Sequence, residues 1–253
     1  MDTNMTTGTL SILIPTYEMG GVGAAMLQRA LDSIAQQRTF GEVDVEIVVA
    51  DHSVDTSVQL VTQRFAPLGN MSIRYVRNER RRGSSSANLN RAFSESQGEF
   101  IKVLFQDDFL LTETALLRTV STLRSTNSQW LICGTTHTRD GANFFGEMIP
   151  AYHDRIHLGR NTVSSPSVLA MRRSAWLDFD PKLIWLMDVD VYRRLRLRCG
   201  LPTVLTDILV ANGIGDHQVT NTRVSLARKL AELSYVSLKH AWLSLGRQGN
   251  GET

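Results

Sequence analysis

Two adjacent aspartates follow an apolar stretch near the middle of the chain. The residues from Phe100 to Phe105 favour β-strands, and Gln106, Asp107 and Asp108 come directly after them, which predicts a buried strand that ends in two carboxylates. Neighbouring carboxylates repel each other and lose hydration when covered, so such a pair is tolerated where a cation or water meets it. Carboxylate oxygens are preferred ligands of Mg²⁺ and Mn²⁺, which in turn bind phosphate oxygens. The pair therefore predicts a metal and phosphate site, and the alternative is an ordinary surface turn.

Polar residues also follow two earlier predicted strands. An apolar run over residues 10–14 leads into the segment from Pro15 to Glu18, and a run over residues 45–50 leads into Asp51. Predicted helices alternate with these strands and with a further strand over residues 72–76, an order typical of βαβ units in a parallel sheet. Ligands of such sheets bind outside the carboxyl ends of the strands. The polar strand ends therefore favour a ligand site over a surface turn.

The second half of the chain holds another pair of acids at the start of a predicted helix. Asp188 and Asp190 open this helix, which extends to Cys199 and carries arginines in its later turns. This order of charges suits the helix dipole and by itself needs no function. The pattern also predicts strands over residues 130–135 and 204–210 and a last helix over residues 223–245.

A histidine pair in the loop-rich middle region has the spacing of a zinc-protease motif. Asp154 stands between His153 and His157 where that motif needs Glu, and Pro150 and Gly159 leave little room for the helix that it requires. We therefore do not expect a zinc site in this segment.

Length, charge and cysteine content narrow the class of protein. The 253 residues suffice for one large α/β domain, and 27 basic against 25 acidic residues give a formal net charge of +2, which gives no reason to expect nucleic-acid binding. Cys133 and Cys199 lie far apart beside apolar residues, so we expect reduced thiols and a cytoplasmic protein. No apolar run reaches the length of about 18 residues that a membrane span needs, and residues 1–9 lack the features of a signal peptide.

In combination these motifs resemble family 2 glycosyltransferases, which have the GT-A fold. The resemblance covers about residues 10–220 and is carried by motifs in the family's order and approximate spacing: Ser11–Tyr17, Val48–Thr56, the 83–98 segment with Asn88 and Asn90, Asp107–Asp108, and Met187–Asp190. It implies a GT-A type α/β fold, with a Rossmann-like, mostly parallel sheet flanked by helices. Residues 1–253 would form a single domain, with a nucleotide-binding half over 8–110, an acceptor half over 111–220, and a C-terminal helix and tail over 221–253.

The resemblance also implies a role for each matching position. Asp188 would be the catalytic base, Asp108 and His217 would bind a divalent metal ion (Mn²⁺ or Mg²⁺), and Asp51 would receive the imino proton of uracil. The expected nucleotide-binding residues are Pro15, Thr16, Tyr17, Glu18, Asp51, Ser53, Arg82, Asn88 and Asp107, and the expected acceptor-site residues are Ser165, Pro166 and Ser167. The chain departs from the family pattern at Ala50, Phe105 and Met187, where the family often has acids.

The implied activity is inverting transfer of a sugar from a nucleoside diphosphate sugar, UDP- or dTDP-linked, to an acceptor hydroxyl. The acceptor would be a glycan or a lipid-linked molecule in the synthesis of cell-surface polysaccharide or glycoconjugate. One alternative is a non-catalytic scaffold that binds sugar nucleotides or glycans, but the intact Asp107, Asp108 and Asp188 argue against it. A second is a sugar nucleotidyltransferase, which needs a glycine-rich, arginine-bearing loop where this chain has the segment from Pro15 to Glu18.

The last predicted helix combines basic and large apolar residues. It could lie on an anionic membrane, which would suit a lipid-linked acceptor and a location at the inner face of the membrane. Alternatively, its apolar side packs against the rest of the protein. The residues concerned are Arg223, Arg228, Lys229, Lys239 and Arg247 with Leu226, Leu230, Leu233, Tyr235, Leu238 and Trp242.

Overall fold

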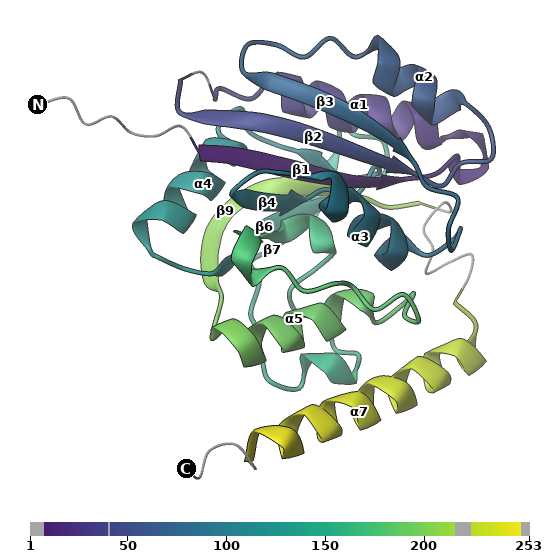
Figure 1. The fold of residues 1–253 in the computed structure, drawn as a ribbon, viewed down its shortest axis with the longest axis vertical. Helices are drawn as coiled ribbons and strands as arrows, with labels where there is room; N and C mark the ends of the chain where they lie inside the picture. Colours follow the sequence, from purple (N-terminus) through teal and green to yellow (C-terminus); the bar gives the residue numbers. More distant parts are fainter. Residues whose placement is uncertain (1–7, 40, 216–223, 249–253) are drawn as a thin grey trace, which may run out of the picture.

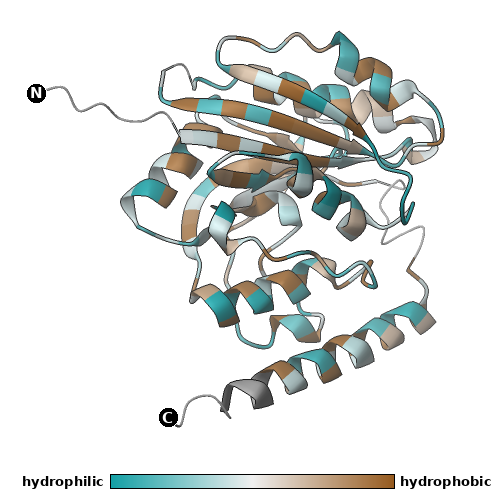
Figure 2. Cartoon of the chain, in the orientation of Figure 1, coloured by the Kyte–Doolittle hydropathy of each residue, from teal (hydrophilic) through white to brown (hydrophobic). Residues whose placement is uncertain are grey.

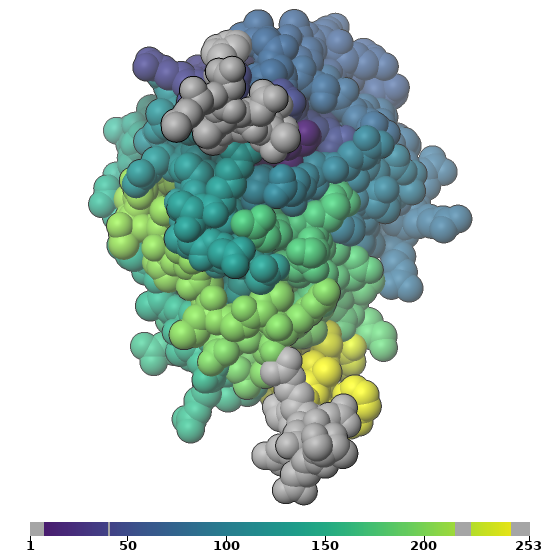
Figure 3. Space-filling view, turned by 60° about the vertical axis from the view of Figure 1, so that its left-hand side comes forward, coloured from purple at the N-terminus to yellow at the C-terminus, as the bar shows by residue number. Residues whose placement is uncertain are grey.

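A mixed β-sheet runs through the whole molecule and joins its two halves. The computed structural model describes residues 8–39, 41–215 and 224–248. The strands of the sheet follow the order β3-β2-β1-β4-β8-β6-β9-β5, and β7 pairs with β6 outside this path (Figure 1). The blue residues of the first half gather at one end of the molecule and the yellow residues of the C-terminal helix at the other (Figure 3).

The first half of the sheet is parallel, as the sequence predicts. β1 (Gly8–Thr16) lies between β2 (Val43–Asp51) and β4 (Phe100–Val103), and β3 (Met71–Arg77) lies beyond β2. Nearly every residue of β1 and β2 is buried, because strands covered by helices on both faces are apolar throughout rather than alternating. The register pairs Thr16 with Asp51 and Asp51 with Arg77, so the polar strand ends do meet at one edge.

The helices of the first half cover both faces of these strands. In Figure 1, α1 (Gly23–Ala35) and α2 (Ser57–Arg64) lie above the sheet and α3 (Ser85–Glu95) lies below it. α3 begins at Ser84, whose hydroxyl accepts a hydrogen bond from the N–H of Ala87 at 3.2 Å, as an N-cap serine does. The turn η1 (Met19–Gly21) connects β1 to α1.

The second half of the sheet is mixed. β8 (Leu169–Arg172) runs antiparallel to both β4 and β6 (Trp130–Thr138). β9 (Thr203–Gly213) runs parallel to β6 and antiparallel to the short β5 (Phe109–Leu110). The remaining elements are α4 (Ala115–Ser125), β7 (Phe144–Met148), η2 (Ile156–Leu158), η3 (Pro166–Val168), η4 (Arg173–Ala175), α5 (Met187–Cys199) and α7 (Leu226–Gln248).

One hydrophobic cluster extends across both halves and includes residues of β1, β6, α5 and α7. Trp130, Phe100, Phe179 and Tyr192 are among its largest fully buried side chains, and such residues contribute most of the apolar area removed from water. Figure 2 shows the strands of the sheet as predominantly hydrophobic, whereas the helices carry both kinds of residue.

Several expectations from the sequence can be checked directly. The predicted strand over residues 204–210 lies within the longer β9, and the predicted last helix corresponds to α7. The 153–157 segment forms a turn that enters η2 and not a helix, and the described residues contain no group of three or more His, Cys, Asp or Glu that could hold a metal ion. Both cysteines are free thiols. In the described part of the chain, no helix combines the length and the apolar character that crossing a membrane requires.

Candidate active site

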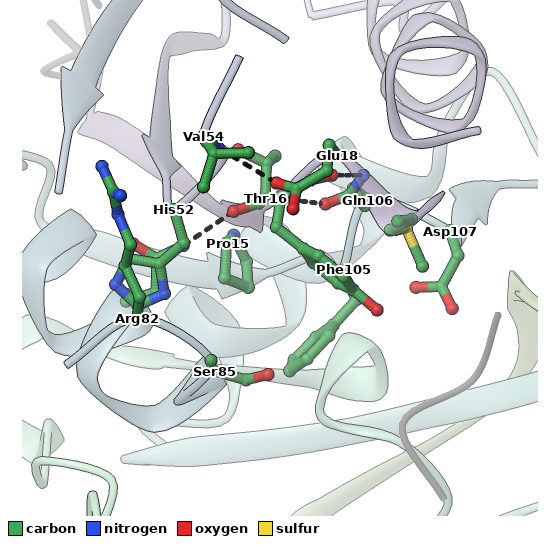
Figure 4. A pocket seen from close by; sticks show the side chains of 14 residues that line it. Pro15, Thr16, Glu18, His52, Val54, Arg82, Ser85, Phe105, Gln106 and Asp107 are labelled. Atoms are coloured by element: carbon green, nitrogen blue, oxygen red, sulfur yellow. Dashed lines mark hydrogen bonds between the residues drawn. The ribbon is translucent and has the colours of Figure 1, made fainter. Parts of the chain in front are cut away.

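A cavity of about 260 Å³ opens at the carboxyl ends of β1 and β4. Figure 4 shows His52 and Arg82 at one side of it, Asp107 at the other and the ring of Phe105 between them. The lining residues are Pro15, Thr16, Tyr17, Glu18, Met19, His52, Val54, Arg82, Gly83, Ser85, Asn88, Phe105, Gln106 and Asp107. The expected nucleotide-binding residues therefore come together here, with the exception of Asp51 and Ser53.

The loop after β1 is held in place by Gln106. Its side-chain amide accepts a hydrogen bond from the N–H of Tyr17 at 2.6 Å and donates to the carbonyl oxygens of Tyr17 at 2.9 Å and Gly23 at 3.1 Å. Gly23 is needed at this position, because a Cβ atom would lie 2.1 Å from the carbonyl oxygen of Tyr17. Gln106 thus connects the end of β4 to the loop after β1, a role that the sequence did not reveal.

Asn88 connects the ends of β1 and β2. Its side-chain Nδ2 donates to the carbonyl oxygens of Thr16 at 3.1 Å and Ala50 at 2.7 Å, and its Oδ1 accepts from Asn78 at 3.1 Å. The first turn of α3 reaches the cavity through Ser85, and the free N–H groups and dipole of a helix N-terminus favour an anion there. The exposed Arg82 lies on the same side.

Asp51 lies behind the cavity wall with no exposed surface. Its Oδ1 accepts from the N–H and the hydroxyl of Ser53 at 2.8 and 2.6 Å, and its Oδ2 accepts from Tyr75 at 2.7 Å and Arg77 at 3.2 Å. These donors occupy both oxygens of the carboxylate. In this arrangement Asp51 and Ser53 shape the segment that carries His52 and Val54, and they do not themselves face the cavity.

The adjacent Asp107 and Asp108 have different surroundings. Asp107 is half-buried and lines the cavity, whereas Asp108 is only 3% exposed. The oxygens of Asp108 accept hydrogen bonds from the hydroxyl of Ser165 at 3.0 Å, the amide of Asn212 at 2.9 Å and the N–H of Gly213 at 2.9 Å. Burial, and after it the charge of Asp107, raises the pKa of Asp108 above its usual range.

The two acids lie differently towards the cavity, which bears on the expectation that Asp108 binds the metal ion. Asp107 lines the cavity, whereas Asp108 does not line it and accepts hydrogen bonds from Asn212 and Gly213. Residues 106 and 107 form a turn between β4 and β5, and the sequence alone could not tell which of the two acids lines the cavity. His217, the other expected metal ligand, lies outside the described residues.

Asp188 stands in the first turn of α5 and is half-buried. Its Oδ2 accepts a hydrogen bond from the side chain of Asn161 at 2.7 Å, and its Oδ1 accepts one from the N–H of Val189 at 2.7 Å. Burial raises the pKa of Asp188 to about 7 and outweighs the hydrogen bonds, which lower it. A carboxylate with such a pKa can accept a proton near neutral pH.

Asp190, two residues further on, is fully buried among cationic groups. Its carboxylate accepts from Arg194 at 2.9 Å, from Lys239 at 3.0 Å and from His240 at 3.0 Å. Burial acts to raise the pKa of Asp190, but the hydrogen bond from His240 and the charges of Arg194 and Lys239 lower it to about 2. The structure therefore presents Asp188 as the titratable acid and Asp190 as a structural one.

A chain of hydrogen bonds connects Asp108 to Asp188. Asn212 donates to Asp108 and accepts from the hydroxyl of Ser164 at 2.9 Å, the N–H of Ser164 donates to Asn161 at 3.1 Å, and Asn161 donates to Asp188. Ser164 has a φ of 92°, which is unusual for a residue other than glycine. No periodicity or motif in the sequence indicated Asn161 or Asn212.

The segment expected to line the acceptor site is largely covered. Pro166 and Ser167 are buried. The hydroxyl of Ser167 accepts from the N–H of Phe105 at 2.8 Å, and its carbonyl accepts from the buried Lys102. Ser165 retains some exposed surface, but its hydroxyl is bonded to Asp108. Pro166 and Ser167 are therefore covered in this arrangement, and Ser167 bonds to Lys102 of β4 and to Phe105.

Solved structures with a similar fold are glycosyltransferases. S. aureus TarS in complex with UDP (residues 1-349) has a TM-score of 0.63 and 19% identity, over 92% of this chain and 71% of that one. The mannosyltransferase PcManGT from Pyrobaculum calidifontis in complex with GDP-Man and Mn²⁺ has a TM-score of 0.64 and 15% identity, over 93% of this chain and 65% of that one. Similarity at this level of identity shows the GT-A fold alone.

The chain spans only 43% of a longer TarS structure, to which it is 18% identical with a TM-score of 0.63 over 92% of its own length. A comparison with curated protein sequences finds no match. Residues 11–179, which include the loop after β1, α3 and the pair Asp107–Asp108, match the sequence profile of glycosyl transferase family 2. This protein is a member of that glycosyltransferase family.

Proposed function

We propose that this protein transfers a sugar from a nucleoside diphosphate sugar to an acceptor hydroxyl with inversion at the anomeric carbon. The observation that carries the proposal is the cavity at the carboxyl ends of β1 and β4, with Asp107 at one side. Structural neighbours have been solved with UDP, with UDP-GlcNAc and with GDP-Man and Mn²⁺, which supports a donor of this class. UDP is the nucleotide that we expect first, and dTDP and GDP are the alternatives.

The chemistry of the cavity suits a nucleoside diphosphate. Its apolar lining includes Pro15, Val54 and the ring of Phe105, against which a base or ribose can pack. The helix N-terminus at Ser85 and the guanidinium of Arg82 favour negative charge on the same side.

Asp107 fits a divalent metal ion bound together with a diphosphate. Mg²⁺ and Mn²⁺ are usually held by one or two carboxylates plus phosphate oxygens and water, and Asp107 presents one such carboxylate to the cavity. A bound ion would stabilise the negative charge that develops on the leaving diphosphate. Arg29 holds the backbone of Asp107 in place, since its Nη2 donates a hydrogen bond to the carbonyl oxygen of Asp107 at 2.7 Å.

Asp188 is the proposed base. The acceptor oxygen attacks the anomeric carbon, the bond from that carbon to the phosphate oxygen breaks with its electron pair on the diphosphate, and the acceptor proton passes to the carboxylate of Asp188. One displacement of this kind inverts the anomeric configuration. Asn161 and the N–H of Val189 hold the carboxylate in place, and its pKa of about 7 allows it to take up the proton.

A glycan or lipid-linked acceptor used in cell-surface polysaccharide synthesis would suit the outer face of α7. Large apolar side chains of α7 remain exposed, by 73% at Leu226, 58% at Leu230, 74% at Leu238 and 73% at Trp242. Figure 2 shows hydrophobic and hydrophilic positions alternating along this helix. Its only acid within residues 226–243 is the buried Glu232, while Arg228 is exposed.

We therefore propose that this face of α7 rests on an anionic membrane surface, at its cytoplasmic side. The free thiols of Cys133 and Cys199 suit a reducing cytoplasm. The expected alternative is that the apolar side of the helix packs on the protein. Among the described residues of α7, Leu233, Tyr235 and Val236 pack on the hydrophobic cluster in this way.

Calorimetric titration tests the donor proposal. We expect UDP to bind in the presence of Mn²⁺ or Mg²⁺ and to bind much more weakly with EDTA, with dTDP and GDP measured in parallel. Absence of binding by all three nucleotides in both metals would contradict the proposal. Binding without release of nucleoside diphosphate from any sugar donor would favour a non-catalytic scaffold instead.

A further inference from the structure

The start of α5 lacks an acceptor of its own at the N-cap position. Leu186 occupies that position, and its apolar side chain accepts no hydrogen bond from the helix. Helix starts leave N–H groups without intrahelical partners, and these usually find a side-chain acceptor. Because Asp188 follows two residues later, the conformation of residues 184–186 determines where its carboxylate points.

Glu232 of α7 binds the backbone that leads into α5. Its Oε1 accepts from the N–H of Ile184 at 3.0 Å, and its Oε2 accepts from the N–H groups of Trp185 at 2.9 Å and Leu186 at 3.0 Å. The side chain is nearly buried, with 4% of the residue exposed, and Arg228 lies 3.6 Å from Oε1. Hydrogen bonds to an ionised acceptor are stronger than neutral ones, so this carboxylate holds consecutive N–H groups firmly.

Other contacts dock α7 on the protein without Glu232. Tyr235 and Lys239 donate to Asp180 at 2.8 and 2.7 Å, and Lys239 and His240 contact Asp190. Val236 is fully buried in the hydrophobic cluster. Loss of the Glu232 carboxylate would therefore release the backbone of residues 184–186 while α7 stays in place.

We propose that Glu232 is a positioning residue, which fixes the backbone of residues 184–186 and thereby directs the Asp188 carboxylate towards the acceptor hydroxyl. This inference rests on the proposed role of Asp188 as the base. Glu232 acts from α7 through the backbone, and Asn161 holds the same carboxylate directly. Two titratable groups interact electrostatically with Asp188. The negative charge of Glu232 adds to burial in raising the pKa of Asp188, and the charge of Asp188 adds to burial in raising the pKa of Tyr192 in α5.

Amide hydrogen exchange tests the geometric step without any assay of activity. The variant Glu232→Gln keeps the shape of the side chain but places an N–H₂ group where the carboxylate accepts, so we expect faster exchange at Ile184, Trp185 and Leu186. Tyr235→Phe is the matched control, because it removes one hydrogen bond of α7 to Asp180 and should leave exchange at these amides unchanged. Equal protection in wild type and Glu232→Gln would overturn the proposal.

The kinetic step is tested with whichever of UDP-GlcNAc and GDP-mannose the protein turns over, with release of the nucleoside diphosphate as the measured rate. We expect Glu232→Gln to lower kcat about 10- to 100-fold, since a misplacement of about 1 Å can have this effect. The affinity for UDP with Mn²⁺ should stay near wild type. The acid limb of the pH profile should move to lower pH, because removal of a negative charge lowers the pKa of Asp188. The shift of this limb reports the charge of Glu232 near Asp188, whereas a fall in kcat at unchanged UDP affinity reports the positioning.

The outcomes separate this inference from the proposed function. Wild-type turnover in Glu232→Gln, combined with a large loss in Asp188→Asn, overturns the inference and leaves the proposed function intact. Wild-type turnover in Asp188→Asn overturns the base assignment itself. A parallel loss of UDP affinity and turnover in Glu232→Gln, or an equal loss in Tyr235→Phe, would show general disruption and also overturn the inference.

Discussion

Asp108 and Asp190 are equally hidden from solvent, but their pKa values shift in opposite directions. The described donors to Asp108 are neutral and include Ser165, Asn212 and the N–H of Gly213, and the pKa of Asp108 is raised above the usual range. Asp190 accepts from Arg194, Lys239 and His240, and its pKa falls to about 2. Burial disfavours the charged form of both, so the charge of the partners decides the result.

The neighbours of these two acids, Asp107 and Asp188, are each half-buried. Asp107 lines the cavity beside the neutral network around Asp108, whereas Asp188 is half-buried beside an ion-pair cluster that holds α5 and α7 together. At the donor side, the buried acid can change its charge and supports the acid that meets the ligand. At the base side, the buried Asp190 stays ionised and acts as a structural anchor, and the half-buried Asp188 is the acid with a pKa of about 7.

The largest effect is expected for Asp188→Asn. The change keeps the shape and removes the base, so sugar transfer should fall by about 10²- to 10⁴-fold while the affinity for donor stays nearly unchanged. In the wild type, transfer should increase as the pH rises through about 7, because the base must lose its proton first. Initial rates across pH and calorimetry of the donor measure both parts.

Asp154→Asn is the control for this variant, since it removes an exposed carboxylate that pairs with Arg193 of the same helix. It should leave transfer nearly unchanged. Near-wild-type transfer by Asp188→Asn, or loss of donor binding in that variant, would refute the assignment of Asp188 as the base.

Asp190→Asn should mainly lower stability. Removal of one partner of a buried ion pair typically costs about 3–5 kcal/mol, because Lys239 and Arg194 lose their counter-charge. The folded-state pKa of Asp190 lies below its ordinary value, so its contribution is fully present above about pH 4 and is lost as the pH falls towards about 2. Denaturant unfolding at pH 7 and at pH 3 should therefore show a smaller difference in the variant than in the wild type.

Asp207→Asn provides the comparison, because its ion pair with Arg118 is exposed and should be worth less than about 1 kcal/mol. An equal loss of stability in Asp190→Asn and Asp207→Asn would contradict the role of Asp190 as an anchor. Well below its melting temperature, Asp190→Asn should retain far more transfer activity than Asp188→Asn.

The sequence was informative wherever the chemistry followed from local patterns. Alternation of strands and helices predicted the parallel first half, and the strand ends predicted the edge at which Thr16, Glu18 and Asp107 line one cavity. Residues two apart on a helix point about 200° apart, so the different surroundings of Asp188 and Asp190 could also be anticipated.

The remaining features depend on partners that are distant in the chain. Asn212 is separated from Asp108 by 104 positions, and Glu232 from Leu186 by 46. No local pattern reports such hydrogen bonds. For this reason the sequence could not show that the donors around Asp108 come from distant residues, or that Pro166 and Ser167, two of the expected acceptor-site residues, are buried.

Asp107→Asn distinguishes the two acids at the donor side. If Asp107 holds the metal, the increase in UDP affinity that Mn²⁺ causes should be at least about 10-fold smaller in this variant than in the wild type. Mutation of residues that only support a metal ligand already lowers metal affinity by about this factor. Asp108→Asn should keep the metal-dependent gain, but it should lose about 1–3 kcal/mol of stability because an amide cannot accept from all the donors around it. Calorimetry with Mn²⁺ and with EDTA measures the first effect, and denaturant unfolding the second.

Asp154→Ala is the control for the metal experiment, because it lies in the 153–157 segment that resembles a zinc motif. The metal-dependent gain should be the same as in the wild type. The reverse pattern, in which Asp108→Asn loses the metal dependence and Asp107→Asn keeps it, would restore the assignment of Asp108 as the ligand.

The smallest expected effect is on membrane binding by α7, whose inner and outer faces differ in burial, as the two acids of each pair do. The inner face carries Glu232, Lys239 and His240 into charged contacts, and the outer face exposes Leu238 and Trp242. The wild type should sediment more with vesicles that contain phosphatidylserine than with phosphatidylcholine vesicles. The double variant Leu238→Ser, Trp242→Ser should bind the phosphatidylserine vesicles up to about 10-fold more weakly. The reason is that each apolar side chain buried in the membrane contributes on the order of 1 kcal/mol or more. Leu201→Ser, at an apolar residue that is 64% exposed outside α7, is the control and should sediment like the wild type. Equal sedimentation with anionic and neutral vesicles, or an equal loss in the control, would show that the outer face of α7 does not bind a membrane.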